Sequence, residues 1–177
     1  MPKGVQVRLL PLAPFFMQTF LPYPDFRRSA WALDNRRLGK QRVECLQLLQ
    51  ALTGFKTVET VTGWRLDSFN PKGWVNHPAT KMWRGYEGSL AEYAIACCDE
   101  WVRRGYRDTC RQRIITLVPT ADPAVKARDA VKPPWFGDEA FHASHRSNLL
   151  RKDPKWYGHA QFGWAEPNDL PYIWPVE

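Results

Sequence analysis

One predicted helix carries the residues of this chain that are best suited to chemistry. Its polar residues recur every three or four positions and so form one stripe, which consists of Arg37, Lys40, Gln41, Glu44 and Gln47. Lys40 lies one helical turn before Glu44, and Arg37 lies two turns before it. Nearby positive charge keeps a carboxylate ionised and opposes the rise in pKa that burial would cause. A carboxylate in this position is suited to stabilising a developing cation and to positioning a nucleophile.

The same stripe also has a simpler interpretation, as the solvated face of an ordinary helix. Lys40 and Glu44 would then form an exposed ion pair, a contact that is common and contributes little to stability. The spacing within the helix, taken by itself, favours this second interpretation.

Helical periodicity over most of the chain predicts the elements that position this stripe. The helix of Glu44 has its apolar residues on the opposite side and ends at Gly54. Further helices are expected after Asp25, from Pro78 to about Gly85, from about Ser89 to Arg104, and from Asp138 to Lys152. The roughly twenty residues after Gly54 and the proline-rich residues 115–137 are expected to be loops.

Length and composition predict one compact, mainly α domain over residues 1–177, with long proline-rich loops and no obligatory partner subunit. The chain is long enough to bury its own core, and 44% of its residues are hydrophobic. It has no apolar run of about 18 residues, so no membrane contact is expected. The cysteines at positions 45, 97, 98 and 110 have no CxxC spacing and are expected to be reduced thiols of a cytoplasmic protein. No metal site is expected, because the histidines and cysteines lack ligand spacing.

The charge of the chain favours an anionic partner. The net charge is +7, and 14% of the residues are aromatic. A basic domain attracts nucleic acid, and aromatic rings can stack on unpaired bases.

Three strings resemble the phage endonuclease V family, the pyrimidine-dimer DNA glycosylases with abasic-site lyase activity. LDNRRLGKQRVECLQLL (33–49) looks like the family's catalytic helix, with Asp34, Leu38 and Glu44 at the matching positions. NHPATKMW (76–83), followed by LAEYAIACCDEWVRRGY (90–106), resembles the family's middle segment. HRSNLLRKDPKWY (145–157) is similar to the family's last helix and the Pro-x-Trp-Tyr after it. The three strings occur in the family's order.

The resemblance implies a compact helical domain that acts on DNA without metal or organic cofactor. It also implies attack by the chain's own α-amino group on the anomeric carbon of a damaged nucleotide. The Schiff base that follows permits strand cleavage by β-elimination, and Glu44 inherits the role of the essential acid/base. An α-amino group suits the attack because its ordinary pKa is about 8.

The amine that attacks is left open by the sequence. Glu44 has 43 residues before it, or 27 if translation starts at Met17 and residues 1–16 are an extension. Removal of Met1 would expose Pro2, a secondary amine that can form an iminium, whereas Gln18 would block removal of Met17. Pro2 and Met17 are therefore the candidate nucleophiles, with activated water or Lys40 as alternatives.

Other polar and aromatic residues are expected to face the DNA. The candidates for groove and phosphate contact are Arg37, Lys40, Asn76, His77, His145, Arg146 and Lys152, and those for stacking on a flipped-out base are Trp156 and Tyr157. Alternatively, Asn76 and His77 cap a helix, the basic residues form a solvated face, and the two aromatic rings pack in the core.

The sequence thus predicts a DNA N-glycosylase that excises a damaged or modified pyrimidine from duplex DNA. Two alternatives remain: a non-catalytic DNA-binding protein on the same scaffold, and a glycosylase that acts on a hypermodified base or a nucleotide.

Overall fold

The structure, a computed structural model, describes residues 18–72, 74–121 and 130–176. The helices of these residues are α1 (Phe26–Ala32), α2 (Asn35–Thr53), α3 (Pro78–Trp83), α4 (Glu87–Arg103), α5 (Arg111–Leu117), a 3-10 turn (Pro119–Ala121), α6 (Glu139–Lys152) and α7 (Pro154–Tyr157). The strands β1 (Phe55–Thr60) and β2 (Gly63–Ser68) form the sheet of the described residues. The prediction of a mainly α protein is confirmed.

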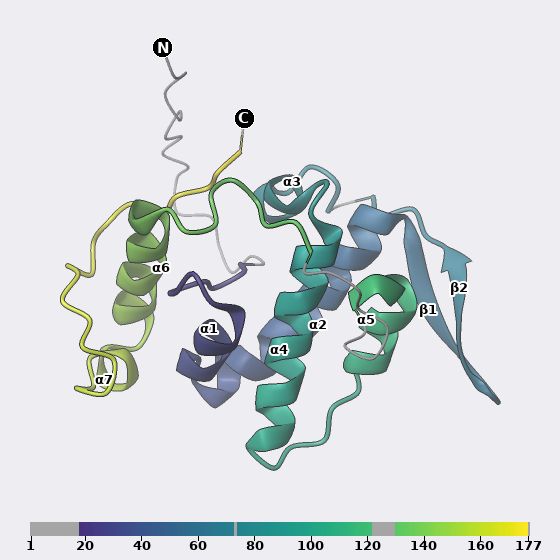
Figure 1. The fold of residues 1–177 in the computed structure, drawn as a ribbon, viewed down its shortest axis with the longest axis horizontal. Helices are drawn as coiled ribbons and strands as arrows, with labels where there is room; N and C mark the ends of the chain where they lie inside the picture. The colour runs from purple at the N-terminus through teal and green to yellow at the C-terminus, as the bar shows by residue number, and fades with distance from the viewer. Residues whose placement is uncertain (1–17, 73, 122–129, 177) are drawn as a thin grey trace.

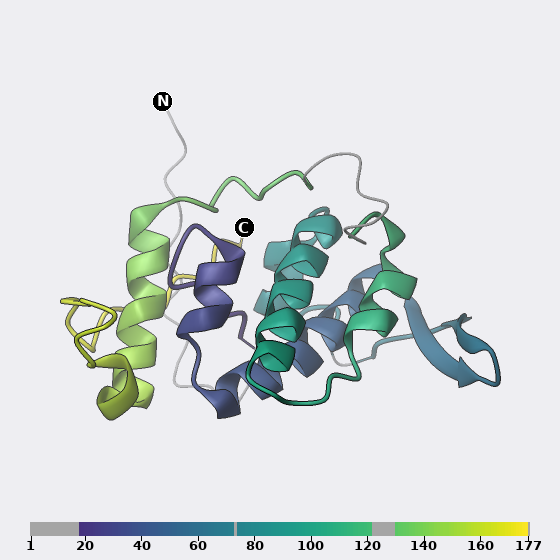
Figure 2. The same cartoon turned by 60° about the horizontal axis from the view of Figure 1, so that its bottom comes forward.

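The long helices α2 and α4 pack against each other at the centre, and α1 lies against α4 (Figure 1). Their apolar faces meet in the core, where Leu38, Cys45 and Leu49 of α2 and Leu90 and Cys97 of α4 are fully buried. Helix α6 stands on the far side of α1, and the C-terminal segment winds along the outside of α6 (Figures 1 and 2). The helix that carries Glu44 is therefore central to the fold.

Aspartate side chains begin the helices that the sequence predicted. Asp25, Asp34 and Asp138 each accept a hydrogen bond from a backbone N–H in the first turn of α1, α2 and α6. At the other end of α2, Gly54 adopts the left-handed conformation with a φ of 72°. A residue without Cβ adopts this conformation at no steric cost, so α2 ends where its periodicity ends.

The expected loop after Gly54 is wrong, because this stretch forms an antiparallel hairpin. Thr60 pairs with Gly63 across a two-residue turn, and the hairpin projects beyond α5 (Figure 1). Helix α5 holds the hairpin through Arg113, whose Nε donates to Thr57 Oγ1 at 2.8 Å and whose guanidinium lies over the ring of Trp64. The loop predicted for residues 115–137 is also wrong at its start, because this part contains the end of α5 and the 3-10 turn.

All four cysteines are buried and unpaired, as expected for reduced thiols. None of the helices within the described residues is long and apolar enough to cross a membrane.

Candidate active site

Glu44 lies on the inner side of α2 rather than on a solvated face. Its side chain is 8% exposed, and Oε1 lies 3.3 Å from Nζ of Lys40, which is 60% exposed. The expectation of an exposed ion pair is therefore wrong. Burial raises the pKa of the Glu44 carboxyl, and the positive charges of Lys40 and Lys152 oppose this rise only in part. The sequence predicted that positive charge would outweigh burial at Glu44. That prediction assumed an exposed carboxyl, whereas the fold buries it.

The segment 18–22 runs past Glu44. A backbone hydrogen bond from Gln18 reaches the Glu44 carboxyl and favours its ionised form. Gln41, one turn before Glu44 on α2, holds this segment at two points. Its Nε2 donates to the carbonyl of Gln18 at 2.8 Å, and its Oε1 accepts the N–H of Phe20 at 3.0 Å. A buried amide of the polar stripe thus fixes the chain beside the buried carboxyl.

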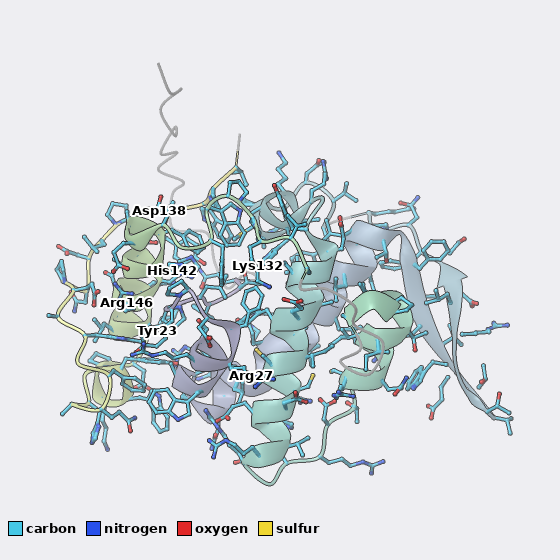
Figure 3. All side chains as sticks on the ribbon, viewed as in Figure 1. Tyr23, Arg27, Lys132, Asp138, His142 and Arg146 are labelled. Carbon is cyan, nitrogen blue, oxygen red and sulfur yellow. The ribbon has the colours of Figure 1, made fainter. Side chains whose placement is uncertain are left out.

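Helices α3, α4 and α6 hold the same segment from other sides. Thr19 Oγ1 accepts a hydrogen bond from Trp83 Nε1 at 3.0 Å, and Tyr93 donates its hydroxyl to the carbonyl of Phe20 at 2.6 Å. On α6, where Asp138, His142 and Arg146 follow one another along the helix in Figure 3, the Arg146 Nη1 donates to the carbonyl of Pro22 at 2.8 Å. Four of the five residues in this segment are thereby anchored, although the segment lies outside any helix or strand.

Cations from two helices surround Glu44. Lys152, at the end of α6, has a pKa lowered by its burial and further by the positive charges of Arg37, Arg151 and Lys40. The predicted phosphate contacts Arg37, Lys40 and Lys152 are thus brought together, although they come from opposite ends of the chain. Arg151 joins this basic cluster, and its Nη2 donates to Asn148 Oδ1 at 3.0 Å.

Asp34 ties the start of this site to α7. Its carboxylate accepts hydrogen bonds from Arg37 Nη1 at 2.6 Å and from the Tyr157 hydroxyl at 2.7 Å. Burial opposes ionisation of Asp34, but these hydrogen bonds outweigh it and lower its pKa. The predicted catalytic-helix residue Asp34 is therefore a helix cap and a tether.

Three of the predicted DNA contacts face the protein interior in this structure. His145 and Tyr157 are fully buried, and Arg146 is 7% exposed and paired with Glu139 and Glu166. Their burial disagrees with the expected contacts to phosphate or a base, and Tyr157 packs in the core, as the alternative interpretation had it. The spacing of His145 and Arg146 on α6 placed them near the basic residues but could not show that the C-terminal segment covers that side of the helix.

The remaining predicted contacts lie at the surface or at a helix start. His77 caps α3, accepting the N–H of Ala79 at 3.1 Å, so the capping interpretation holds for it, whereas Asn76 is exposed. Trp156 is 38% exposed and donates its Nε1–H to the carbonyl of Ala32 at 3.1 Å. The candidate nucleophiles Pro2 and Met17 lie outside the described residues.

Tyr172 was missed by the sequence analysis. Its hydroxyl lies 3.5 Å from His145 Nδ1. Burial raises the pKa of Tyr172 far above its usual value, and the negative charge of Glu44 adds to the rise. No spacing signal links these residues, because the C-terminal segment reaches the site only through its path along α6.

The described residues contain no group of three or more histidine, cysteine or acidic side chains that could hold a metal ion.

In a comparison with known protein families, residues 17–113 match the pyrimidine dimer DNA glycosylases, and this region is more than half of the chain. The chain belongs to this family. The matching region begins next to Gln18 and includes Glu44 and helices α1 to α4. No curated protein and no solved structure gave a significant match. Membership of this family supports DNA glycosylase activity, with DNA as the partner.

Proposed function

We propose that the protein excises a damaged or modified pyrimidine from duplex DNA and then cleaves the abasic strand through a Schiff base. The observation that carries this proposal is the buried Glu44 carboxyl, which has a raised pKa and accepts a backbone hydrogen bond from the segment that follows Met17. Such a carboxyl holds its proton to a higher pH than an exposed glutamate does, which favours a role in general acid–base catalysis.

In the proposed reaction, a free amine of the chain attacks the anomeric carbon of the damaged nucleotide. The new N–C bond replaces the glycosidic bond, and the base departs with the bonding electrons and takes up a proton. Loss of the sugar ring oxygen as a leaving group gives the Schiff base. Glu44 then removes a proton from the adjacent sugar carbon, and the 3′ phosphate leaves in a β-elimination.

The anchored segment favours Met17 over Pro2 as the source of this amine. Four helices hold residues 18–22, and the backbone of Gln18, the residue that follows Met17, hydrogen-bonds to Glu44. In a chain that begins at Met17, the α-amino group would be one residue from Gln18, whereas Pro2 is sixteen residues from it. Lys40 is the alternative amine, because its Nζ already lies 3.3 Å from Glu44 Oε1.

The basic cluster of Arg37, Lys40, Arg151 and Lys152 supports binding of the phosphates that flank the damaged nucleotide. The nucleotide must leave the base stack to reach a buried carboxyl, at a cost of about a few kcal/mol. Phosphate contacts on both sides of the extruded nucleotide can offset this cost.

Base release and strand cleavage on ultraviolet-irradiated, abasic and hypermodified duplexes test the proposal. We expect base release and cleavage from the folded protein, and loss of both in Glu44→Gln. Glu59→Gln, in the exposed hairpin, is the matched control and should behave as the wild type. Salt-sensitive DNA binding without any chemistry would instead identify a non-catalytic DNA-binding protein.

Borohydride reduction identifies the amine. We expect a covalent protein–DNA adduct, and peptide mapping should place it at Met17 in a chain that begins there. An adduct at Pro2 or Lys40 would reassign the nucleophile. Base release without any adduct would show that activated water attacks and that the enzyme has no lyase step.

A further inference from the structure

We propose that His142 and His145 are positioning residues, which clamp Leu21 from both sides and so hold the segment 18–22 against Glu44. This inference rests on the proposed function, because it assigns the two histidines a role in the reaction of Glu44. Neither side chain is exposed, so neither contacts DNA directly.

The hydrogen bonds of the clamp fix the proton on each ring. The N–H of Leu21 donates to His145 Nδ1 at 3.0 Å, so this nitrogen has no proton and His145 is the neutral Nε2–H tautomer. The N–H of Gly137 donates to His142 Nε2 at 3.0 Å, so His142 carries its proton on Nδ1. That proton is donated to the carbonyl of Leu21 at 2.7 Å. Two neutral histidines of opposite tautomer therefore hydrogen-bond to both backbone groups of Leu21, one to its N–H and the other to its carbonyl.

The clamp acts on the chain close to the reacting groups. Leu21 is three residues after Gln18, whose backbone hydrogen-bonds to Glu44. Besides the clamp, the backbone of residues 18–21 is held by Gln41 and Tyr93. The side chains of Thr19 and Gln18 add contacts to Trp83 and Asn148. Because a small misplacement of a reacting group is costly in rate, the histidines would act on the catalytic step.

Protonation of His145 would put a second donor on Nδ1 opposite the Leu21 N–H and break that half of the clamp, whereas protonation of His142 on Nε2 would break its contact with the Gly137 N–H and leave its bond to the Leu21 carbonyl. Burial lowers the pKa of both histidines and thus protects the neutral forms. The charged groups around the pair are Asp138, Glu139 and Arg146 of α6, and the C-terminal segment adds the neutral hydroxyl of Tyr172. The loop before α6 and the segment 18–22 face the rings with backbone groups. Acid conditions should therefore release the Leu21 N–H from His145.

Nitrogen-15 NMR of the full chain tests the clamp independently of any activity. At pH 8 we expect His142 as the Nδ1–H tautomer and His145 as the Nε2–H tautomer. On acidification, the amide signals of Leu21 and Gln18 should shift together with the imidazole signals. The same tautomer on both rings, or a shift of Leu21 that leaves Gln18 unchanged, would overturn the proposal.

Variants test the link to the reaction. In His145→Asn the amide oxygen can accept the Leu21 N–H, and in His142→Asn the amide nitrogen can donate to the Leu21 carbonyl, so both variants should keep base release near the wild-type rate. His145→Leu removes the acceptor and should lower kcat by roughly 10–100-fold with little change in KM. His159→Asn, at an exposed histidine, is the matched control and should have no effect.

The pH profile separates the clamp from the titration of Glu44. In the His142→Asn/His145→Asn double variant, the acid-side loss of base release that follows the Leu21 signal in the wild type should disappear. An unchanged profile would assign that loss to Glu44 and overturn the proposal, as would a folded His145→Leu variant with the wild-type rate. If the wild type releases no base from any substrate, the proposed function fails, and the NMR titration still decides whether the clamp positions Gln18.

Discussion

Burial and positive charge act in opposite directions on Glu44, and burial prevails. The folded protein therefore favours the protonated carboxyl more than the unfolded chain does. A group of this kind stabilises the fold at low pH, and its contribution is lost as the pH rises through its folded pKa. Glu44 is thus a residue whose ionised form costs the protein stability, as expected for a catalytic carboxyl rather than for a structural ion pair.

The variant Glu44→Gln should lose at least about 10²–10⁴-fold in the rate of base release, the usual contribution of an acid–base catalyst. Its melting temperature near neutral pH should equal or exceed that of the wild type, because glutamine keeps the shape without the buried charge. Rate assays and thermal denaturation on the same preparation measure both effects. Near-normal base release would remove Glu44 from the mechanism, and a large loss of stability would show that its charge is structural.

At the scale of elements, the five predicted helical segments were found, whereas α5, α7 and the hairpin were not predicted. Helix α2 has periodic apolar residues, and α2 and α6 both have aspartate caps, and these are local signals. The hairpin has little buried surface of its own, since Thr57 is its one buried residue, and it depends on Arg113 of α5. Such a contact is set by tertiary structure and leaves no pattern within residues 55–68.

The candidate site was likewise predictable only where its residues lie on one helix. Glu44, Arg37 and Lys40 share a helix face and could be identified by their spacing. The side chains that anchor the segment 18–22 come from four helices, so their convergence depends on the packed fold. The interior position of His145 likewise depends on the path of the C-terminal segment beside Tyr172.

Asp34→Ala should destabilise the protein by about 2–4 kcal/mol. About 1 kcal/mol comes from loss of the cap of α2, and the rest from leaving the buried hydroxyl of Tyr157 without its acceptor. Asp25→Ala is the matched control, because Asp25 caps α1 through the Arg28 N–H and should contribute only about 1 kcal/mol. Urea unfolding of both variants compares them. Equal losses would mean that the tether to α7 contributes nothing.

At the scale of the whole molecule, the net charge of +7 matters most where the basic cluster gathers it beside Glu44. Each phosphate contact of this cluster releases counterions from DNA on binding, so affinity should fall steeply with salt. If the same charge were spread evenly over the surface, removal of any single basic residue would change the affinity for DNA less.

Lys152→Ala should weaken binding to damaged and undamaged duplex alike, and should reduce the slope of log affinity against log salt by about 1. Lys56→Ala, in the exposed part of β1, removes the same charge far from α6 along the fold and should leave the slope unchanged (Figure 1). Fluorescence anisotropy over a salt series measures both. Identical slopes in the two variants would place the DNA elsewhere on the surface.

All four cysteines are buried, so their reaction with a thiol reagent can measure opening of the core. A thiol must be exposed and ionised to react with an alkylating reagent, and burial raises the pKa of Cys45, Cys97, Cys98 and Cys110. The native chain should therefore resist labelling, and each alkyl group found by mass spectrometry should count one opening event. Cys45 is next to Glu44 and accepts a hydrogen bond from Gln41 Nε2 at 3.6 Å, so its labelling would record when α2 separates from the segment 18–22. Early labelling of Cys45 ahead of Cys97 would show that this site opens while the rest of the core stays closed.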